Sequence, residues 1–301
     1  MAKRTIIFRA DGGPSIGMGH FSRTLALAEM LNEEFHCVYA TRQPTDHQIA
    51  EIERICHDRI DLPGNDSHFE EFLENLKGDE IVVLDNYYFT TEYQKEIKAK
   101  GCKLVCIDDI HDKHYVADLV INHAEGAKPE GFSCENYTKL LLGYKFALLR
   151  KSFLRNENFK EEKKYSFLII MGGVDSLNLA KDILGNLQDK DIEKPIAVVN
   201  PKEKIRLSGV TCFNNINEFE VSQLMEKSLY GIFPASTVAI EACAKRLPFI
   251  GGYFVDNQRN IYKGLEDKNL AVCIGNFLSV SKANLLKAIE SLQNPYLYES
   301  I

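Results

Sequence analysis

Short apolar runs alternate with amphipathic segments along almost the whole chain, and this alternation restricts the fold more than any other feature. In the first half the runs lie at residues 5–9, 81–84 and 103–107. Segments with apolar residues at helical spacing stand between them, such as residues 23–31 and 91–100. Continuous apolar runs of this length are typical of strands buried on both faces of a parallel sheet. The pattern predicts a doubly wound α/β fold.

The second half repeats this pattern, with predicted strands at residues 165–171, 229–233 and 247–251. Between the halves, residues 156–164 (NENFKEEKK) are charged and nearly devoid of apolar side chains, as is typical of a linker. A chain of 301 residues suits two domains of about 150 residues each. We therefore expect two Rossmann-like domains, one at residues 1–155 and one at residues 156–301.

Residues 16–23 (IGMGHFSR) join the first predicted strand to the first predicted helix. Gly17 and Gly19 allow the backbone to pass close to a ligand, and free N–H groups at a helix start favour an anion. The same positive helix end disfavours an imidazolium, so we expect His20 to be neutral, as a general base requires. In the alternative interpretation the glycines only form a tight turn and His20 caps the helix. The stretch lacks the dinucleotide-binding fingerprint G-x-G-x-x-G, because Ser22 occupies the position of the third glycine.

Polar side chains follow the predicted strands of the first half at the points where the strands end. Because ligands of doubly wound sheets bind at the carboxyl ends of the strands, we expect these side chains to surround one crevice. They are Asp11, His20, Asp85, Asn86, Tyr87, Asp108 and Asp109. The alternative is that an acidic residue caps the next helix, which we favour for Asp108 and Asp109. Tyr87 has no role as a cap, so a functional role is favoured for it.

Two predicted turns of the second half suit a phosphate group. Gly172 and Gly173 allow a close backbone approach after a strand, and Ser236 and Thr237 offer hydroxyl and N–H groups at a helix start. Glu241 lies on or near the same helix face, where its carboxylate can accept hydrogen bonds from ribose hydroxyls. The alternative is that Ser236 is an ordinary N-cap and Glu241 an ordinary helix carboxylate.

The composition excludes several classes of protein. A formal charge of −7 and a pI near 5.7 argue against nucleic acid or an anionic membrane as the main partner. No apolar run approaches the roughly 18 residues of a membrane helix, and the N-terminus has no signal-peptide core, so we expect a cytoplasmic protein. The eight cysteines are scattered without a C-x-x-C pair, which favours reduced thiols and no metal site. All eight histidines lie in the first half, which must therefore supply any catalytic histidine.

Several short blocks carry a resemblance to a known family. They are FRAD at 8–11, IGMGH at 16–20, DNY at 85–87, FALLR at 146–150, MGGVD at 171–175, AST at 235–237 with Glu241, and NQ at 257–258. In this order they resemble the PseG family, UDP-sugar hydrolases of pseudaminic acid biosynthesis that are related to MurG-type glycosyltransferases. The tandem halves agree, since they indicate the GT-B architecture with an interdomain ligand cleft.

The resemblance implies hydrolysis of UDP-2,4-diacetamido-2,4,6-trideoxy-β-L-altropyranose to UDP and free sugar, with inversion at the anomeric carbon and with neither metal nor cofactor. It implies that His20 activates the water and that Tyr87 positions water or sugar. The substrate-binding residues that we expect are Asp11, Gly17, Gly19, Asn86, Gly172, Gly173, Ser236, Thr237, Glu241 and Asn257. In this set Ser236, Thr237 and Glu241 hold UDP, Gly172 and Gly173 border it, and Asn257 reaches the sugar or the phosphate.

One position departs from the family pattern, because the family's Asp-His-Tyr is Asp85-Asn86-Tyr87 here. Asn86 can form hydrogen bonds but cannot titrate, so the sugar that is hydrolysed can differ from that of the family. Two other functions stay open: a GT-B glycosyltransferase with an alcohol acceptor, and a non-catalytic UDP-sugar-binding protein. The sequence does not determine the oligomeric state, and domain closure on binding is an expectation from the two-domain architecture.

Overall fold

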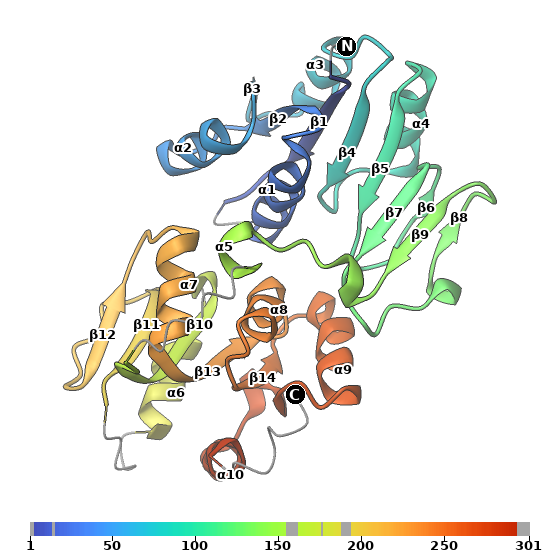
Figure 1. The fold of residues 1–301 in the computed structure, drawn as a ribbon. Coiled ribbons are helices and arrows are strands. Elements are labelled where there is room, and N and C mark those ends of the chain that lie inside the picture. Colours follow the sequence, from blue (N-terminus) through green and yellow to red (C-terminus); the bar gives the residue numbers. More distant parts are fainter. Residues whose placement is uncertain (1–2, 14–15, 155–161, 176, 188–193, 294–301) are drawn as a thin grey trace. The chain divides into compact units, whose positions relative to one another are not determined.

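Each half of the chain forms a parallel β-sheet with helices packed on it (Figure 1). The structure, a computed structural model, describes residues 3–13, 16–154, 162–175, 177–187 and 194–293. The chain divides into two units, Met1–Lys151 and Ser152–Ile301, inside the short helix α5 (Lys151–Leu154). The predicted boundary after residue 155 and most of the predicted linker lie outside the described residues.

The first unit has a seven-stranded parallel sheet in the order β3-β2-β1-β4-β5-β7-β9. Its strands are β1 (Thr5–Ala10), β2 (His36–Arg42), β3 (Asp58–Leu62), β4 (Ile81–Asp85), β5 (Lys103–Ile107), β7 (Leu119–Asn122) and β9 (Lys139–Leu142). A separate pair consists of β6 (His114–Tyr115) and β8 (Ser133–Cys134). The helices are α1 (Gly19–Leu31), α2 (Asp46–Ile55), α3 (His68–Glu74), α4 (Thr91–Ala99), and the 3₁₀ turns η1 (Pro129–Gly131) and η2 (Tyr144–Phe146).

Two apolar clusters cover the two faces of this sheet. Ile6 and Phe8 of β1 pack with α1 and α2, whereas Ile7 between them packs with α3 and α4. This alternation follows from the period of two in a strand, and burial on both sides explains why the central strands are continuously apolar. Helices on both faces make this unit a three-layer sandwich. Because β4 lies between β1 and β5 in the parallel sheet, the carboxyl ends of these three strands are neighbours at one edge.

The second unit has a six-stranded parallel sheet in the order β12-β11-β10-β13-β14-β15. Its strands are β10 (Tyr165–Asp175), β11 (Ile196–Pro201), β12 (Val210–Phe213), β13 (Ser228–Pro234), β14 (Phe249–Tyr253) and β15 (Val272–Asn276). Its helices are α6 (Leu179–Leu187), α7 (Glu218–Lys227), α8 (Thr237–Ala244), α9 (Arg259–Asp267), α10 (Lys282–Leu292), and the 3₁₀ turns η3 (Asp256–Gln258) and η4 (Phe277–Ser279).

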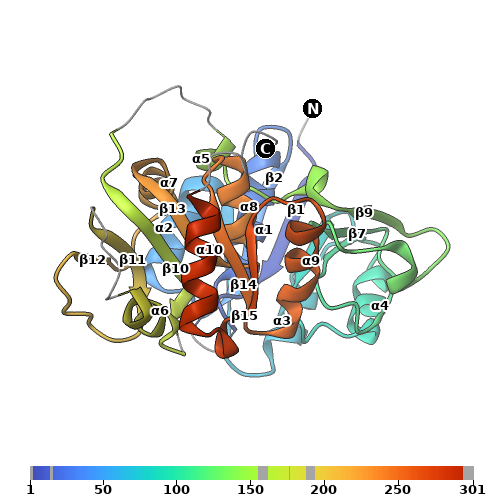
Figure 2. The ribbon, with the colours of Figure 1, turned by 90° about the horizontal axis from the view of Figure 1, so that it is seen from below.

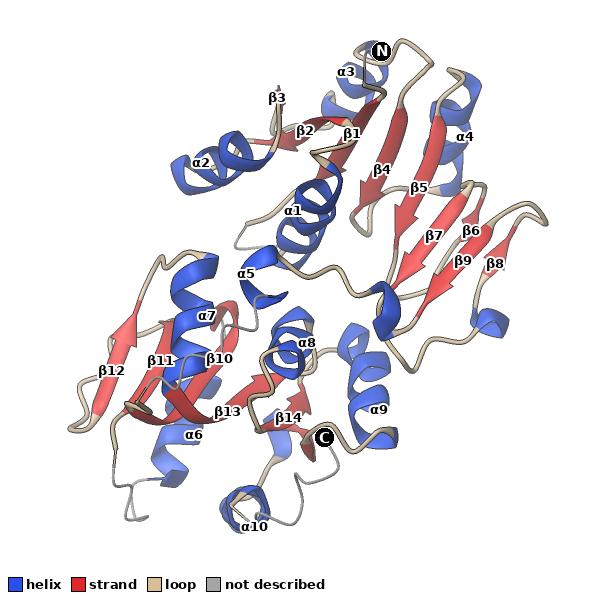
Figure 3. Ribbon diagram, viewed as in Figure 1, coloured by secondary structure: helices blue, strands red, loops and turns tan. Residues whose placement is uncertain are grey.

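The second sheet is also covered on both faces. Phe167 and Ile169 of β10 pack with α6 and α10, while α7, α8 and α9 lie on the other face (Figures 1 and 2). Strands and helices alternate through most of this unit as the sequence predicts, but β12, which the sequence does not predict, follows β11 without a helix between them (Figure 3). Within the described residues, no helix is long and apolar enough to span a membrane.

Candidate active site

The predicted glycine-bearing turn leads directly into helix α1. Backbone N–H groups of Gly13 and Gly17 each donate to the other residue's carbonyl, at 3.2 and 2.7 Å, which closes the loop after β1. Gly17 has φ +85°, a conformation that a side chain would strain. The helix begins at Gly19, and within the described residues no side-chain cap is formed at its N-cap residue, Met18. His20 therefore lies in the first turn of a helix whose positive end is open.

The imidazole of His20 is held by the carboxylate of Asp85. Nδ1 of His20 lies 2.7 Å from Oδ1 of Asp85, and both side chains are buried. Nη2 of Arg23 also lies near Nδ1, at 3.1 Å, but the contact with Asp85 is the shorter one. An ionised carboxylate only accepts hydrogen bonds, so the shorter contact places the His20 proton on Nδ1. Nε2 then carries the lone pair, and in the part of the chain that the structure describes it forms no hydrogen bond. The pair presents a nitrogen that can accept a proton.

Asp85 is in turn fixed by residues of helix α1. Arg23 donates to it through Nε at 2.6 Å and Nη2 at 2.5 Å, and the Thr24 hydroxyl donates at 2.9 Å. Burial alone would raise the pKa of Asp85, but the Arg23 guanidinium and His20 lower it to about 2. The strand register explains the arrangement, because Asp85 is opposite Ala10 at the point where β1 leads into the turn. Asp85 is therefore a carboxylate at neutral pH.

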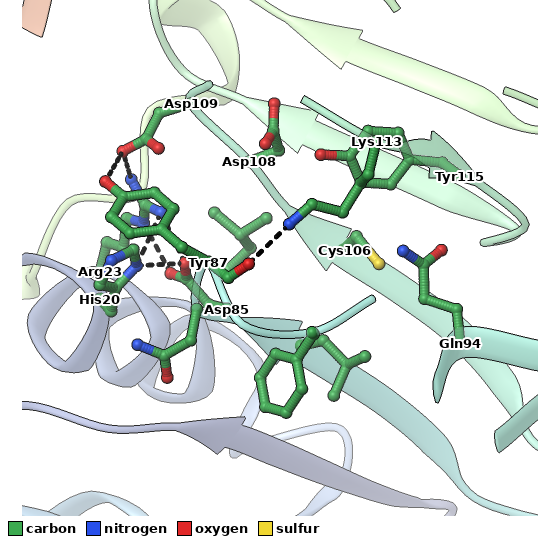
Figure 4. A pocket seen from close by; sticks show the side chains of 14 residues that line it. His20, Arg23, Asp85, Tyr87, Gln94, Cys106, Asp108, Asp109, Lys113 and Tyr115 are labelled. Carbon is green, nitrogen blue, oxygen red and sulfur yellow. Dashed lines mark hydrogen bonds and ion pairs between the residues drawn. The ribbon is translucent and has the colours of Figure 1, made fainter. Parts of the chain in front are cut away.

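Tyr87 lies beside His20 just after the carboxyl end of β4. The two rings meet edge to face with centroids 4.5 Å apart, and 38% of Tyr87 is exposed to solvent. Its hydroxyl donates to Oδ2 of Asp109 at 3.3 Å, and Arg23 donates to the same oxygen (Figure 4). His20, Tyr87 and Asp109 line a cavity of about 20 Å³, which accommodates a water-sized group but not a sugar.

Asp11 and Asn86 occupy the neighbouring loops, and their contacts are with protein groups. The Asp11 carboxylate accepts hydrogen bonds from Arg9, Thr41, Arg42 and Tyr88. Burial opposes ionisation of Asp11, but Arg9 and these hydrogen bonds hold its pKa well below the usual range. The N–H of Asp11 donates to Oδ1 of Asn86 at 2.7 Å. These hydrogen bonds hold the loops after β1 and β4 in place. A direct contact of Asp11 or Asn86 with the substrate stays a prediction.

Three residues of this site were absent from the predicted set or had another role in it. Asp85 was expected at the crevice but not as the partner of His20, because that pairing depends on the register of β1 and β4. Arg23 was missed, although its position three residues after His20 on a helix places the two on one face. Asp109 was predicted to be a helix cap, but its described hydrogen bonds come from the side chains of Arg23 and Tyr87.

The predicted UDP-site residues of the second unit lie at the carboxyl ends of three adjacent strands, β10, β13 and β14. Ser236 and Thr237 are half-buried at the start of α8, where Ser236 has the N-cap position but its side chain caps no N–H group. Glu241 is buried one turn further along α8, and Asn257 lies half-buried in η3. The start of α8 thus keeps its first N–H groups available to an anion.

The other predicted phosphate turn differs from the expectation. Gly172 and Gly173 are in the last part of β10, which continues to Asp175 through an irregularity after Ile170. Gly172 has φ +110°, so the strand bends where a glycine permits it. The Asp175 carboxylate accepts from the N–H groups of Leu179 and Ala180 at 2.9 and 2.8 Å. The start of α6 is therefore occupied by the protein's own carboxylate, which leaves the start of α8 as the better anion site of the two.

Comparisons with known proteins show which proteins the whole chain resembles. No family model matches the chain. A Campylobacter jejuni protein named UDP-2,4-diacetamido-2,4,6-trideoxy-beta-L-altropyranose hydrolase is 29% identical over 282 residues, covering 89% of this chain and 98% of the relative. The spore coat polysaccharide biosynthesis protein SpsG of Bacillus subtilis is 22% identical over 303 residues, covering 95% and 88%. Among solved structures, Acinetobacter baumannii MurG has a TM-score of 0.64 at 13% identity, covering 99% and 93%. The predicted resemblance to PseG-type hydrolases and the predicted GT-B fold are thereby confirmed.

Proposed function

We propose that this protein is an enzyme that hydrolyses the anomeric C–O bond of a UDP-2,4-diacetamido-2,4,6-trideoxyhexose to release UDP and the free sugar. The observation that carries the proposal is the His20–Asp85 pair, in which a carboxylate fixes the imidazole with Nε2 as proton acceptor. The sugar class comes from the name of the Campylobacter relative. The reaction would be a step of nonulosonic (pseudaminic) acid biosynthesis.

In the proposed reaction Nε2 of His20 removes a proton from water while the water oxygen bonds to the anomeric carbon. The bond from that carbon to the diphosphate oxygen breaks, and its electron pair leaves with UDP. Attack on the face opposite UDP inverts the configuration through an oxocarbenium-like transition state, and the base must stand far enough from the sugar to admit the water. The Asp85 carboxylate stabilises the imidazolium that forms. Tyr87, edge-on to His20, positions the water or the sugar.

UDP is assigned to the second unit. The open N–H groups at the start of α8, with the Ser236 and Thr237 hydroxyls, suit the diphosphate, since a helix N-terminus attracts an anion. Glu241 is proposed to contact the ribose and Asn257 the sugar or the phosphate. Because this positive potential is supplied by the backbone, we propose that turnover does not require a metal ion.

The test is UDP release by purified protein from UDP-2,4-diacetamido-2,4,6-trideoxy-β-L-altropyranose and its stereoisomers, without acceptor and with excess EDTA. We expect one UDP per free sugar, ¹⁸O from labelled water at the anomeric position, and an initially inverted anomer by NMR. The stereoisomers are included because Asn86 stands in place of the family's histidine. Tight UDP binding without release from any isomer would contradict hydrolysis, and release only after addition of an alcohol acceptor would indicate a glycosyltransferase instead.

A further inference from the structure

Asp109 is a buried acidic residue whose contacts differ from those of its neighbour Asp108. The Asp108 carboxylate accepts from the N–H groups of Ile110 and His111, and so stabilises the turn after β5. Asp109 has no such backbone partner among the described residues. Instead, its Oδ2 accepts from Nη1 of Arg23 at 2.7 Å and from the Tyr87 hydroxyl at 3.3 Å. The two carboxylates therefore have different roles.

The other oxygen of Asp109 adds no hydrogen bond that would offset the burial of this side chain. Oδ1 is buried and has no hydrogen-bond partner within the described residues. A buried acceptor without a partner costs free energy, so its presence calls for another explanation. What the carboxylate does accomplish is to join a side chain of α1 to one that follows β4.

Both side chains that meet at Asp109 also contact the proposed base or its partner. Arg23 holds the Asp85 carboxylate, which accepts from Nδ1 of His20. The rings of Tyr87 and His20 meet edge to face, with an angle of 81° between their planes. Asp109 thus fixes both neighbours of the imidazole, one on the Nδ1 side and one against the ring.

We propose that Asp109 is a positioning residue for proton transfer by His20. Through Arg23 it braces Asp85, and through the Tyr87 hydroxyl it holds the ring that lies against the imidazole. Its described hydrogen bonds are with the protein, so its effect falls on turnover rather than on UDP affinity. The inference rests on the proposed function, because it assigns a role in the step that His20 performs.

The size of the effect follows from what each variant leaves in place. A displacement of about 1 Å at a reacting group can lower a rate by about 10²-fold. In Asp109→Asn the bonds from Arg23 to Asp85 remain, and the amide oxygen can still accept from Arg23 and Tyr87. The negative charge that strengthens these two bonds is lost, so only part of the positioning is lost. We expect kcat to fall about tenfold, while the dissociation constant of UDP stays within about twofold.

The experiment compares Asp109→Asn with Tyr87→Phe, their double variant and the matched control Asp108→Asn. Tyr87→Phe removes the same link at a partly exposed side chain and keeps the ring, so it tests the inference even if Asp109→Asn does not fold. The double variant should lose little more turnover than the more impaired single variant, because both substitutions act on the same Tyr87–Asp109 hydrogen bond. Asp108→Asn should keep kcat within about twofold. Wild-type kcat in both single variants, an equal loss in Asp108→Asn, or a rise in KM alone would overturn the inference.

A second readout separates this inference from the proposed function. In ¹⁵N-histidine NMR spectra of the protein with UDP, the Nδ1 proton of His20 should exchange with water faster in Asp109→Asn and Tyr87→Phe than in wild type. Equal exchange would overturn the positioning role. If wild type releases no UDP from any sugar, the proposed function fails, and the exchange rates still decide whether Asp109 positions the imidazole.

Discussion

Asp85→Asn removes the charge that orients the proposed base while almost keeping the size of the side chain. The carboxylate accepts from His20, Arg23 and Thr24. An amide presents one N–H₂ group to these donors in place of an oxygen. If that group faces His20, it donates to Nδ1 and moves the imidazole proton to Nε2, where no proton can then be accepted. We expect kcat to fall about 10²–10⁴-fold, the range by which a positioned base typically contributes.

The same substitution has a stability effect whose sign follows from the pKa of Asp85. The folded-state value, about 2, lies below the ordinary value of 3.8 because Arg23 and His20 favour the carboxylate. The difference corresponds to about 2 kcal/mol of folding free energy, which is complete above pH 4 and lost as the pH falls through 2. Asp85→Asn should therefore lower the free energy of unfolding by at least about 2 kcal/mol at pH 7. The difference from wild type should shrink below pH 4.

The assay combines UDP release under saturating substrate with urea unfolding at pH 7 and at pH 3. Asp108→Asn serves as the control for loss of a buried carboxylate at the same edge of the sheet. If Asp85→Asn is folded and retains kcat near that of wild type, Asp85 does not set the proton position of His20. If its destabilisation is the same at both pH values, the argument from the Asp85 pKa is wrong.

Three further substitutions test separate parts of the account. Gly12→Ala should lower the free energy of unfolding by about 1–3 kcal/mol, because an added Cβ would lie 2.7 Å from Cβ of Phe21. Gly13→Ala should change it by less than about 0.5 kcal/mol, because its Cβ meets no atom of the described residues within 4 Å. His123→Leu should raise it by about 1–3 kcal/mol, since both ring nitrogens are buried without a described partner and burial lowers the His123 pKa to about 4; a loss of stability would contradict this. Thr237→Pro removes one N–H at the first position of α8, where proline is tolerated, so calorimetry should show UDP binding about tenfold weaker than in Thr237→Ala. Equal UDP binding by the two variants would contradict a diphosphate site at the start of α8.

The sequence predicts the α/β fold well, because its central strands are buried on both faces and are therefore continuously apolar. The strand β3 (Asp58–Leu62) was missed for the converse reason. Among the described strands it pairs with β2 alone, at the edge of the sheet. Its sequence DRIDL carries charges that remain largely accessible. The sequence predicts a turn at the glycine pair after residue 171, because it cannot show that β10 continues beyond a bend.

The role of a site residue can be predicted from the sequence where it depends on the residue's position in a single helix or strand. It cannot be predicted where it depends on contact with a residue of another element. The position of His20 at a helix start follows from local pattern, and so does the placing of Tyr87 at a strand end. The partnership of His20 with Asp85 requires the register between two strands, and the role of Asp109 requires side-chain directions from three segments. The interdomain ligand cleft and the division of roles between residues 1–155 and 156–301 stay predictions.

The central claim, that His20 is the base of a UDP-sugar hydrolase, is tested most directly by single-turnover UDP release from wild type and His20→Ala. Calorimetric UDP binding by both proteins verifies that the variant retains the nucleotide site. We predict that His20→Ala binds UDP as wild type does and releases it from the sugar at least about 10²-fold more slowly. Equal rates in the two proteins would contradict the account.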